Sequence, residues 1–289
     1  MSNNGFVYVA SLTKPYYDAA VMSAMSIKDY WPEAKLTLFT HKEWVDERRD
    51  PLIFENIITN IPVHCRAKLW ALDQTPYDLT CYMDADTYCE SEDIKYFFDQ
   101  IDDDHDMSMT INRAYNAKVV YFTKDRELRH YKQEDKELIW EGGDEINGKP
   151  LYAVHSWEDT AKNGVYRMMW HCGMFLYRNK PNVLEMLHAW YENYKEQIES
   201  KNSWNYPHPK SLWFWDTYAF WRTNFYKNYN VRIKEIDPKW NFIRGYRESE
   251  LKGEEKIIHH YTLPKRQQDE GIINDPNIRN TVGRFDIFK

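Results

Sequence analysis

Short apolar runs alternate with segments of helical periodicity along the first hundred residues. Residues 6–10, 36–40 and 79–83 are rich in β-branched and aromatic side chains and are predicted strands. Over residues 16–30, apolar positions recur at helical spacing, and Pro15 suits a first helical turn. Strands that alternate with helices are typical of a doubly wound sheet. We therefore expect an α/β fold with a mostly parallel central sheet.

The later part of the chain carries longer and more aromatic segments. Residues 107–111 and 171–177 are predicted strands, and residues 181–198 are a predicted amphipathic helix. A second, very aromatic helix is expected over residues 212–221. Residues 124–149 are dense in charge and poor in apolar side chains, and we interpret them as a surface excursion or a mobile lid.

Two aspartates, Asp84 and Asp86, directly follow the predicted strand 79–83. Residues i and i+2 of an extended segment lie on the same side, so both carboxylates can face one point. Like charges held together are costly unless a cation lies between them, and carboxylates suit a hard divalent ion. Ligands of open α/β sheets bind beyond the carboxyl ends of the strands. We interpret the pair as a Mn²⁺ or Mg²⁺ site for a nucleotide diphosphate, with an exposed aspartate pair in a loop as the alternative.

Further candidates lie late in the sequence. A predicted strand ends in His259 and His260, and Lys265 follows shortly after. A neutral imidazole can join two carboxylates as a third metal ligand, and a lysine can neutralise phosphate. Taken alone, either histidine is more often a core or surface residue than a ligand. Asp216, a lone acid in the aromatic helix, is either a buried cap or a functional carboxylate.

Composition and charge indicate which classes of binding partner the protein can have. The net charge of −7 argues against nucleic acid, because phosphate backbones need basic patches. With 22 Tyr and 12 Trp, the chain has an aromatic load that suits either stacking on sugars or an aromatic core. No stretch approaches a membrane span, and the four scattered cysteines indicate free thiols in a reducing compartment. We therefore expect a cytoplasmic protein.

The order of these motifs resembles the GT-A nucleotide-sugar glycosyltransferases, in particular the glycogenin-like family 8. Tyr-Met-Asp-Ala-Asp-Thr at residues 82–87 is almost the string of that family. Lys68 lies 16 residues before the first aspartate, as a lysine does there. The run from His259 to Lys265 is similar to the family's His-x-x-Gly-x-x-Lys, with Thr262 in place of Gly.

Three weaker matches support the resemblance. Asp237-Pro-Lys-Trp-Asn-Phe242 resembles a further stretch of the family that contains Asn. His171-Cys-Gly-Met is similar to the family's Asn-Ser/Ala-Gly-Val ahead of a strand, with His171 in place of Asn. Asp216-Thr217 stands where the family has Asp-Gln before a helix. The resemblance covers about residues 6–266, with a poor match over 112–167.

The resemblance implies a GT-A fold, a Rossmann-like α/β/α sandwich in a single domain. Residues 1–111 would form the donor-binding half and residues 112–289 the acceptor-binding half. Mn²⁺ or Mg²⁺ would be held by Asp84, Asp86 and His259, since the family spacing to the lysine selects His259 over His260. The residues implied at the nucleotide sugar are Ala10, Ser11, Tyr16, Lys68, Asp84, Ala85, Asp86, Arg113, His171, Gly173 and Lys265.

Roles within that set follow from the same resemblance. Ala10, Ser11 and Tyr16 would hold the uracil and ribose, Tyr16 by stacking. Lys68 and Lys265 would neutralise the diphosphate. The catalytic residue implied is Asp216, facing the donor sugar or the acceptor hydroxyl.

The expected function is metal-dependent transfer of a hexose or pentose from a UDP-sugar to a hydroxyl of a glycan or other acceptor, with inversion and retention both open. A haloacid-dehalogenase-like phosphatase is one alternative, because Asp84-Ala-Asp-Thr87 also fits Asp-x-Asp-x-Thr, although that class usually carries it on the first strand. A sugar nucleotidyltransferase would begin with a Gly-rich loop, and residues 10–16 hold no Gly. A non-catalytic sugar-binding protein is the last alternative.

Overall fold

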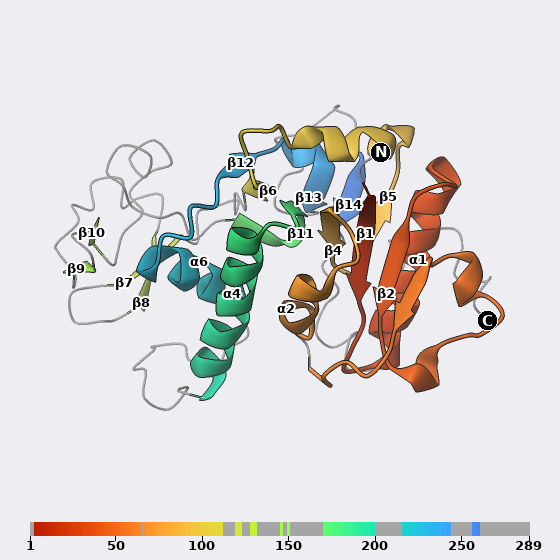
Figure 1. Ribbon diagram of the computed structural model, residues 1–289, viewed down its shortest axis with the longest axis horizontal. Helices are drawn as coiled ribbons and strands as arrows, with labels where there is room; N and C mark the ends of the chain where they lie inside the picture. Colours follow the sequence, from red (N-terminus) through yellow and green to blue (C-terminus); the bar gives the residue numbers. More distant parts are fainter. Residues whose placement is uncertain are drawn as a thin grey trace. The chain divides into compact units, whose positions relative to one another are not determined.

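The computed structural model describes most of the first 111 residues and several later stretches (Figure 1). The described residues are 3–64, 66–111, 119–122, 128–131, 145–146, 149–150, 170–199, 216–243 and 256–260. Arg113, Lys265 and most of the charged segment 124–149 lie outside them, so the expectations for these residues stay predictions.

Within the described residues, the central sheet has seven strands in the order β12-β6-β11-β4-β1-β2-β3. Its continuous parallel part consists of β1 (Asn4–Val9), β2 (Leu36–Phe39), β3 (Asn56–Ile58) and β4 (Leu79–Met83). Strand β11 (Trp170–Arg178) is antiparallel to β4, whereas β12 (Ile233–Glu235) is parallel to β6 (Met107–Ile111). The predicted α/β class with a mostly parallel sheet is confirmed.

Helix α1 (Lys14–Tyr30) carries the chain from β1 to β2. Pro15 occupies its first turn, where the N–H that proline lacks would have no helical partner. In its last turn, Lys28 donates to the carbonyls of Pro32 and Ala34, which places a positive charge at the negative end of the helix. The helix thus begins and ends where its sequence predicts.

Shorter helical turns connect the other strands. They are η1 (Lys42–Trp44), η2 (Asp50–Leu52), α2 (Lys68–Ala71), η3 (Leu72–Gln74), η4 (Glu92–Gln100) and η6 (Pro238–Asn241). The segment that follows Ser91 is the 3₁₀ helix η4. Ser91 caps it by accepting the backbone N–H of Asp93 at 3.2 Å.

A small second sheet joins early and late parts of the chain. It consists of β13 (Phe242–Ile243), β14 (Ile258–His260) and β5 (Thr87–Cys89), in the order β13-β14-β5. Strand β14 is parallel to β13 and antiparallel to β5. Residues near the C-terminal end of the described chain therefore lie beside the segment that follows β4.

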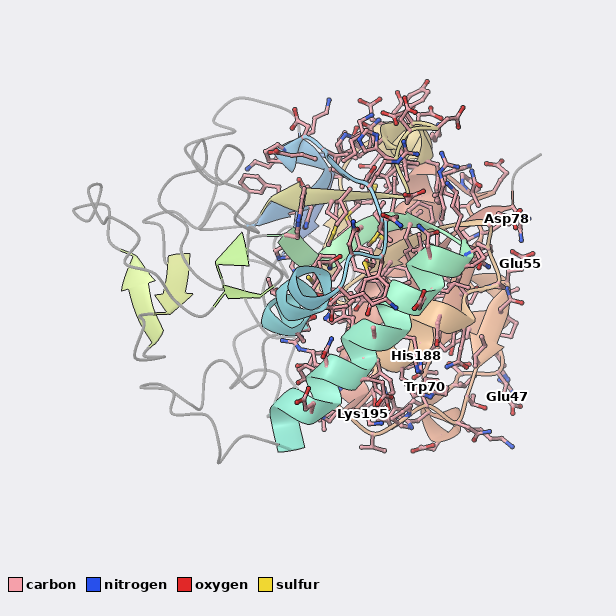
Figure 2. All side chains as sticks on the ribbon, turned by 60° about the vertical axis from the view of Figure 1, so that its left-hand side comes forward. Glu47, Glu55, Trp70, Asp78, His188 and Lys195 are labelled. Carbon is pink, nitrogen blue, oxygen red and sulfur yellow. The ribbon has the colours of Figure 1, made fainter. Side chains whose placement is uncertain are left out.

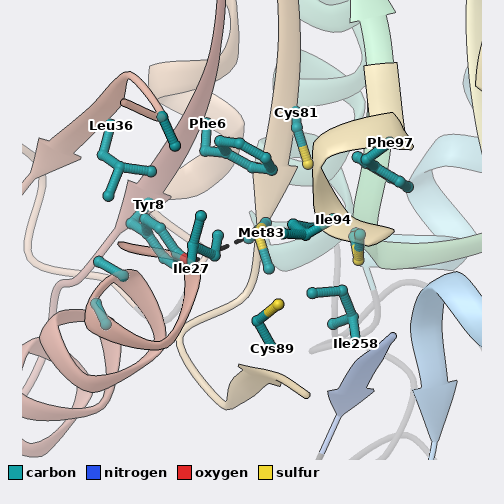
Figure 3. Packing of buried hydrophobic residues seen from close by; sticks show 14 of the residues in the cluster. Phe6, Tyr8, Ile27, Leu36, Cys81, Met83, Cys89, Ile94, Phe97 and Ile258 are labelled. Carbon is teal, nitrogen blue, oxygen red and sulfur yellow. Dashed lines mark hydrogen bonds between the residues drawn. The ribbon is translucent and has the colours of Figure 1, made fainter. Parts of the chain in front are cut away.

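The hydrophobic core gathers apolar side chains of the central sheet, α1 and η4 (Figure 3). Phe6 and Tyr8 of β1 and Met83 of β4 meet Ile27 of α1 and Ile94 of η4, and all five are at most 1% exposed. Burying one such side chain stabilises the fold by roughly 1.5–3 kcal/mol. This packing fixes the carboxyl ends of β1 and β4, where the candidate site lies.

Contacts between residues divide the described chain into two compact units. The first holds the residues up to Thr110, the segment Gly173–Lys180 and the described residues from Arg232 on. The second holds the described residues of Ile111–Cys172 and Pro181–Val231. Its first boundary adjoins residue 111, and the chain returns twice to the first unit. The assignment of donor-binding and acceptor-binding halves stays a prediction.

In the second unit, α4 (Pro181–Glu199) packs against α6 (Asp216–Tyr226). The rings of Trp190 and Phe220 lie 4.8 Å apart, and Trp190 Nε1 donates to the backbone carbonyl of Asp216 at 2.8 Å. The labelled side chains His188 and Lys195 lie on the exposed side of α4 (Figure 2). The helix predicted over 181–198 is confirmed. Of the one predicted over 212–221, residues 212–215 lie outside the described residues, and α6 contains the remainder.

The second unit also contains two short antiparallel strand pairs. They are β7 (Val119–Phe122) with β8 (Leu128–Tyr131), and β9 (Glu145–Ile146) with β10 (Lys149–Pro150).

In the part of the chain that the structure describes, no helix is both long and apolar enough to cross a membrane.

Candidate metal-binding site

Two carboxylates and one imidazole converge beyond the carboxyl end of β4. Asp84, Asp86 and His260 each offer a ligand atom, and these atoms lie within 4.8 Å of one another. His260 Nε2 is 3.2 Å from Asp86 Oδ1 and 3.9 Å from Asp84 Oδ2. Neighbouring ligands of one small divalent ion are typically about 3 Å apart, so modest closure would suit such an ion. The group therefore suits a divalent cation in donor type, and its spacing would suit one after modest closure.

The imidazole of this group belongs to His260, whereas the sequence resemblance selected His259. Strand β14 pairs with β5 in a register that sets His259 opposite Tyr88 and His260 opposite Thr87. Successive side chains of a strand point to opposite faces, so only one of the two histidines can face the aspartates. His259 instead places its Nδ1 3.1 Å from Glu90 Oε1. In the structure the imidazole beside the aspartates is therefore that of His260 and not that of His259, and a role in metal binding stays a prediction.

Asp84 is held by three protein groups. Tyr82 donates its hydroxyl to Asp84 Oδ1 at 2.5 Å, and Lys68 Nζ lies 3.3 Å from the same oxygen. The backbone N–H of Asp84 donates to the carbonyl of Gly173 at 2.7 Å. The second carboxylate oxygen, Oδ2, is the one nearer to His260. The predicted residues Lys68 and Gly173 therefore both lie at the site, each in direct contact with Asp84.

Opposing effects set the charge of His260. Burial disfavours the imidazolium and by itself lowers the pKa of His260, but the charge and hydrogen bond of Asp86, with the charge of Asp84, outweigh burial. The net result is a pKa of His260 raised above the ordinary value. The carboxylates that would attract a metal ion thus also favour a proton on His260, so proton and metal compete for Nε2.

A row of buried hydroxyls fixes the backbone at Asp84. Thr87 donates its hydroxyl to the carbonyl of Asp84 at 2.8 Å, and Ser23 Oγ of α1 lies 2.8 Å from Thr87 Oγ1. Ser23 Oγ also lies 2.9 Å from the hydroxyl of Tyr8 in β1. The turn that carries both aspartates is therefore tied to the first strand and the first helix. We call this set of Tyr8, Ser23 and Thr87 the hydroxyl row.

The loop after β1 lies at the same edge of the sheet. Ala10 donates its backbone N–H to the carbonyl of Phe39 at 2.8 Å. The Ser11 hydroxyl donates to the carbonyl of Pro62 at 2.6 Å, accepts the backbone N–H of His64 at 3.1 Å and lies 3.0 Å from His41 Nε2. Three protein contacts therefore engage the hydroxyl of Ser11, and the role expected for Ala10 and Ser11 at a nucleotide stays a prediction.

Two other residues expected at the nucleotide sugar belong to the core. Tyr16, on the first turn of α1, is partly buried and packs against the hydrophobic cluster. Ala85, between the two aspartates, is 7% exposed and belongs to that cluster. A small apolar side chain at this position lets the turn lie close to the sheet.

The predicted catalytic Asp216 lies in the second unit, at the start of α6. Its side chain is buried, and Oδ1 accepts the backbone N–H of Thr217 at 3.0 Å. A carboxylate at a helix N-terminus is stabilised by the helix dipole. His171, in β11, also belongs to the second unit. The roles expected for both residues stay predictions.

Sequence reasoning missed several groups that shape the site. Tyr82 precedes Asp84 by two residues, so the alternation that paired the aspartates also places its side chain on their side. Ser23 carries a hydroxyl among the small apolar residues of α1, and this pattern indicates a buried polar contact. Glu90 carries no local signal, and the resemblance marks the stretch that contains Asn241 without giving that residue a role. The pairing of β14 with its neighbours brings both residues to the histidines.

Comparisons with known proteins identify the fold. No protein-family model matches the sequence, and no curated protein does. The glycosyltransferase GlyE of Streptococcus pneumoniae TIGR4 is similar over 96% of this chain, with 13% identity and a TM-score of 0.51. The bifunctional glycosyltransferase WbbM is similar over 98%, with 14% identity and a TM-score of 0.51. This chain spans 63% and 51% of those two chains, respectively. The likeness confirms the expected GT-A fold.

Proposed function

We propose that this chain, which has the GT-A fold, is a metal-dependent glycosyltransferase that moves a sugar from a UDP-sugar to a hydroxyl acceptor. The observation that carries the proposal is the convergence of Asp84, Asp86 and His260 at the carboxyl edge of the sheet. Ligands of open α/β sheets bind at this edge, and a cation held by few protein ligands can also bind phosphate oxygens. The names of the two similar structures support the class of reaction.

The donor set supports Mn²⁺ or Mg²⁺ as the ion. Carboxylate oxygens suit both ions, and an imidazole nitrogen favours Mn²⁺ over Mg²⁺ because it is the softer ligand. Asp84, Asp86 and His260 would hold the ion. When bound, such an ion supplies positive charge against the diphosphate that leaves the sugar.

The chain's own residues would act by charge and by position. Breaking the bond between the anomeric carbon and the phosphate oxygen leaves negative charge on the diphosphate and an oxocarbenium-like sugar. Groups that are already fixed where the charge develops give the largest help. Tyr82 and Lys68 hold Asp84 in place, and the Lys68 ammonium adds a positive charge at the same edge. Gly173 fixes the backbone of Asp84 from the neighbouring strand.

We propose that Asp216 contacts either the donor sugar or the acceptor hydroxyl. An inverting enzyme needs a carboxylate that takes the proton of the acceptor hydroxyl, whereas in a retaining enzyme Asp216 would hold hydroxyls of the donor sugar. The use of UDP, the hexose or pentose and the glycan acceptor all rest on the sequence resemblance.

The phosphatase alternative has less support. In an Asp-x-Asp-x-Thr phosphatase the first aspartate is a nucleophile, but here Asp84 Oδ1 accepts from Tyr82 and pairs with Lys68. The hydroxyl of Thr87 donates to the backbone carbonyl of Asp84. Three parallel strands of the central sheet precede this motif in the sequence. None of these features favours phosphate transfer to Asp84.

Titration of UDP into the full chain tests the proposal. We expect UDP to bind in the presence of Mn²⁺, to be released by a chelator and to bind tighter than ADP or CDP. The Asp86→Asn variant has one negative charge fewer at the site and should lose the Mn²⁺-dependent part of the UDP affinity. UDP-sugars would then be screened for UDP release with and without glycan acceptors. Chelator-resistant activity, or phosphate release from sugar phosphates without any nucleotide, would contradict the proposal.

A further inference from the structure

The second ring nitrogen of His260 contacts a buried asparagine. His260 Nδ1 lies 3.1 Å from Asn241 Oδ1. An amide oxygen can only accept a hydrogen bond, so this contact requires the proton on Nδ1. Nε2, which lies 3.2 Å from Asp86 Oδ1, is therefore the nitrogen that is free for a metal ion once it has given up its proton.

Asn241 itself is held from the other side. Its amide nitrogen donates to Thr110 Oγ1 at 3.1 Å, and neither residue has exposed surface. A flipped amide would present its NH₂ group to His260 and favour the opposite tautomer, so the orientation of the Asn241 side chain determines which ring nitrogen is proton-free. Thr110 lies in β6, and this contact therefore joins the central sheet to η6, which directly precedes β13 of the small sheet.

The backbone around Asn241 is also well anchored. The residue ends η6, in which Asp237 accepts the backbone N–H of Lys239 at 2.8 Å. The ring of Trp240 lies 5.1 Å from the ring of Phe97 in the hydrophobic core. Strand β13 follows directly and pairs with β14. The register of this pairing fixes the position of Asn241 relative to His260 along the strands.

We propose that Asn241 is a positioning residue that holds His260 in the Nδ1–H tautomer and presents Nε2 to a metal ion shared with Asp84 and Asp86. The inference rests on the metal site of the proposed function and adds a residue that acts on it through His260. Partners of the second nitrogen of metal-ligating histidines typically contribute about 10-fold to 100-fold in metal affinity.

Mn²⁺ titration of the full chain, followed by the EPR signal of free Mn²⁺, tests the role without any activity assay. Asn241→Leu has similar volume and no acceptor, so we expect affinity about 10-fold to 100-fold weaker than wild type. Asn241→Asp keeps an oxygen for Nδ1–H, and Thr110 can donate to the new carboxylate. We therefore expect that variant to stay within about threefold of wild type.

Two further variants separate positioning from folding. Tyr177→Phe removes the buried hydrogen bond from Tyr177 to the carbonyl of Leu72, so it should lower stability without changing Mn²⁺ affinity. Thr110→Val leaves Asn241 present but lets its amide turn, and we expect affinity about threefold to tenfold weaker. This variant carries the test if Asn241→Leu does not fold.

Several results would overturn the inference. One is a folded Asn241→Leu whose Mn²⁺ affinity stays within about twofold of wild type. Another is an Asn241→Asp variant that loses as much affinity as Asn241→Leu, because the acceptor oxygen would then be irrelevant. A third is Thr110→Val binding Mn²⁺ like wild type when Asn241→Leu is unfolded. A wild-type chain that binds no Mn²⁺ overturns the proposed metal site itself, so the wild-type titration distinguishes the two failures.

Discussion

Tyr82 donates its hydroxyl to Asp84 Oδ1 at 2.5 Å, which directs the other oxygen of Asp84 toward His260. We predict that Tyr82→Phe weakens Mn²⁺-dependent UDP binding by about 10-fold, because the carboxylate loses the contact that orients it. The free energy of unfolding should fall by only about 0.5–1.5 kcal/mol, as for one lost hydrogen bond. Calorimetric titration and urea unfolding measure the two effects. Tyr177→Phe, the same change at a buried tyrosine that contacts Leu72, should lose stability alone.

The two adjacent histidines provide a matched pair of variants. His260→Ala should abolish most Mn²⁺ binding, since it removes the imidazole that faces Asp86. His259→Ala should change Mn²⁺ binding little, because its ring contacts Glu90 on the other face of β14. Mn²⁺ titrations of both variants measure this difference. The reverse ranking would restore the ligand that the sequence resemblance selected.

The strand with its two aspartates could be predicted because the pattern is local. An apolar run that ends in acids at i and i+2 determines both the strand and the side on which Asp84 and Asp86 meet. The choice between His259 and His260 could not be predicted in this way. It depends on the register of β14 against β5, which is set by packing between residues far apart in the sequence. The resemblance marks the stretch that contains Asn241, but the contact of Asn241 with His260 could not be predicted for the same reason.

The contacts of Asp106 predict how the free energy of unfolding depends on pH. It is buried, pairs with Lys180 Nζ at 2.7 Å and accepts the backbone N–H of Arg232 at 3.0 Å. Burial alone raises the pKa of Asp106, but these contacts outweigh it, so its pKa lies below the ordinary 3.8. A carboxyl group with a depressed pKa stabilises the fold above its unfolded pKa, and this stability is lost as the pH falls through the folded pKa.

We therefore predict that Asp106→Asn lowers the free energy of unfolding at pH 7 by about 1–3 kcal/mol. The difference from wild type should shrink below about pH 4, where the wild-type carboxyl begins to be protonated in the unfolded chain. Urea unfolding at several pH values measures this difference. A gap between the two proteins that stays constant down to low pH would mean that charge at Asp106 contributes nothing.

Asp216→Asn tests the proposed role in transfer. The new amide oxygen can still accept the Thr217 N–H, so α6 should begin as in the wild type. We predict that the transfer rate falls by about 10²-fold to 10⁴-fold while UDP affinity stays nearly unchanged, as for the loss of a general base. The anomeric configuration of the product, read by NMR, shows whether the enzyme inverts. Loss of donor selectivity along with rate would instead indicate contact with the donor sugar, and a wild-type rate would remove Asp216 from the site.

The pairing of β14 with β5 has a consequence for how the protein resists unfolding. His259 and Glu90 touch although 169 residues separate them, so the segment that ends in β14 closes a very long loop. Only three residues form this strand, and few backbone contacts offset the entropy of closure. An ion shared by Asp84, Asp86 and His260 would bind only when β14 is paired with β5, and it would therefore stabilise this long-range contact. Resistance to heat and to proteases should then rise with the logarithm of ion concentration, as for any ligand that binds the native state alone.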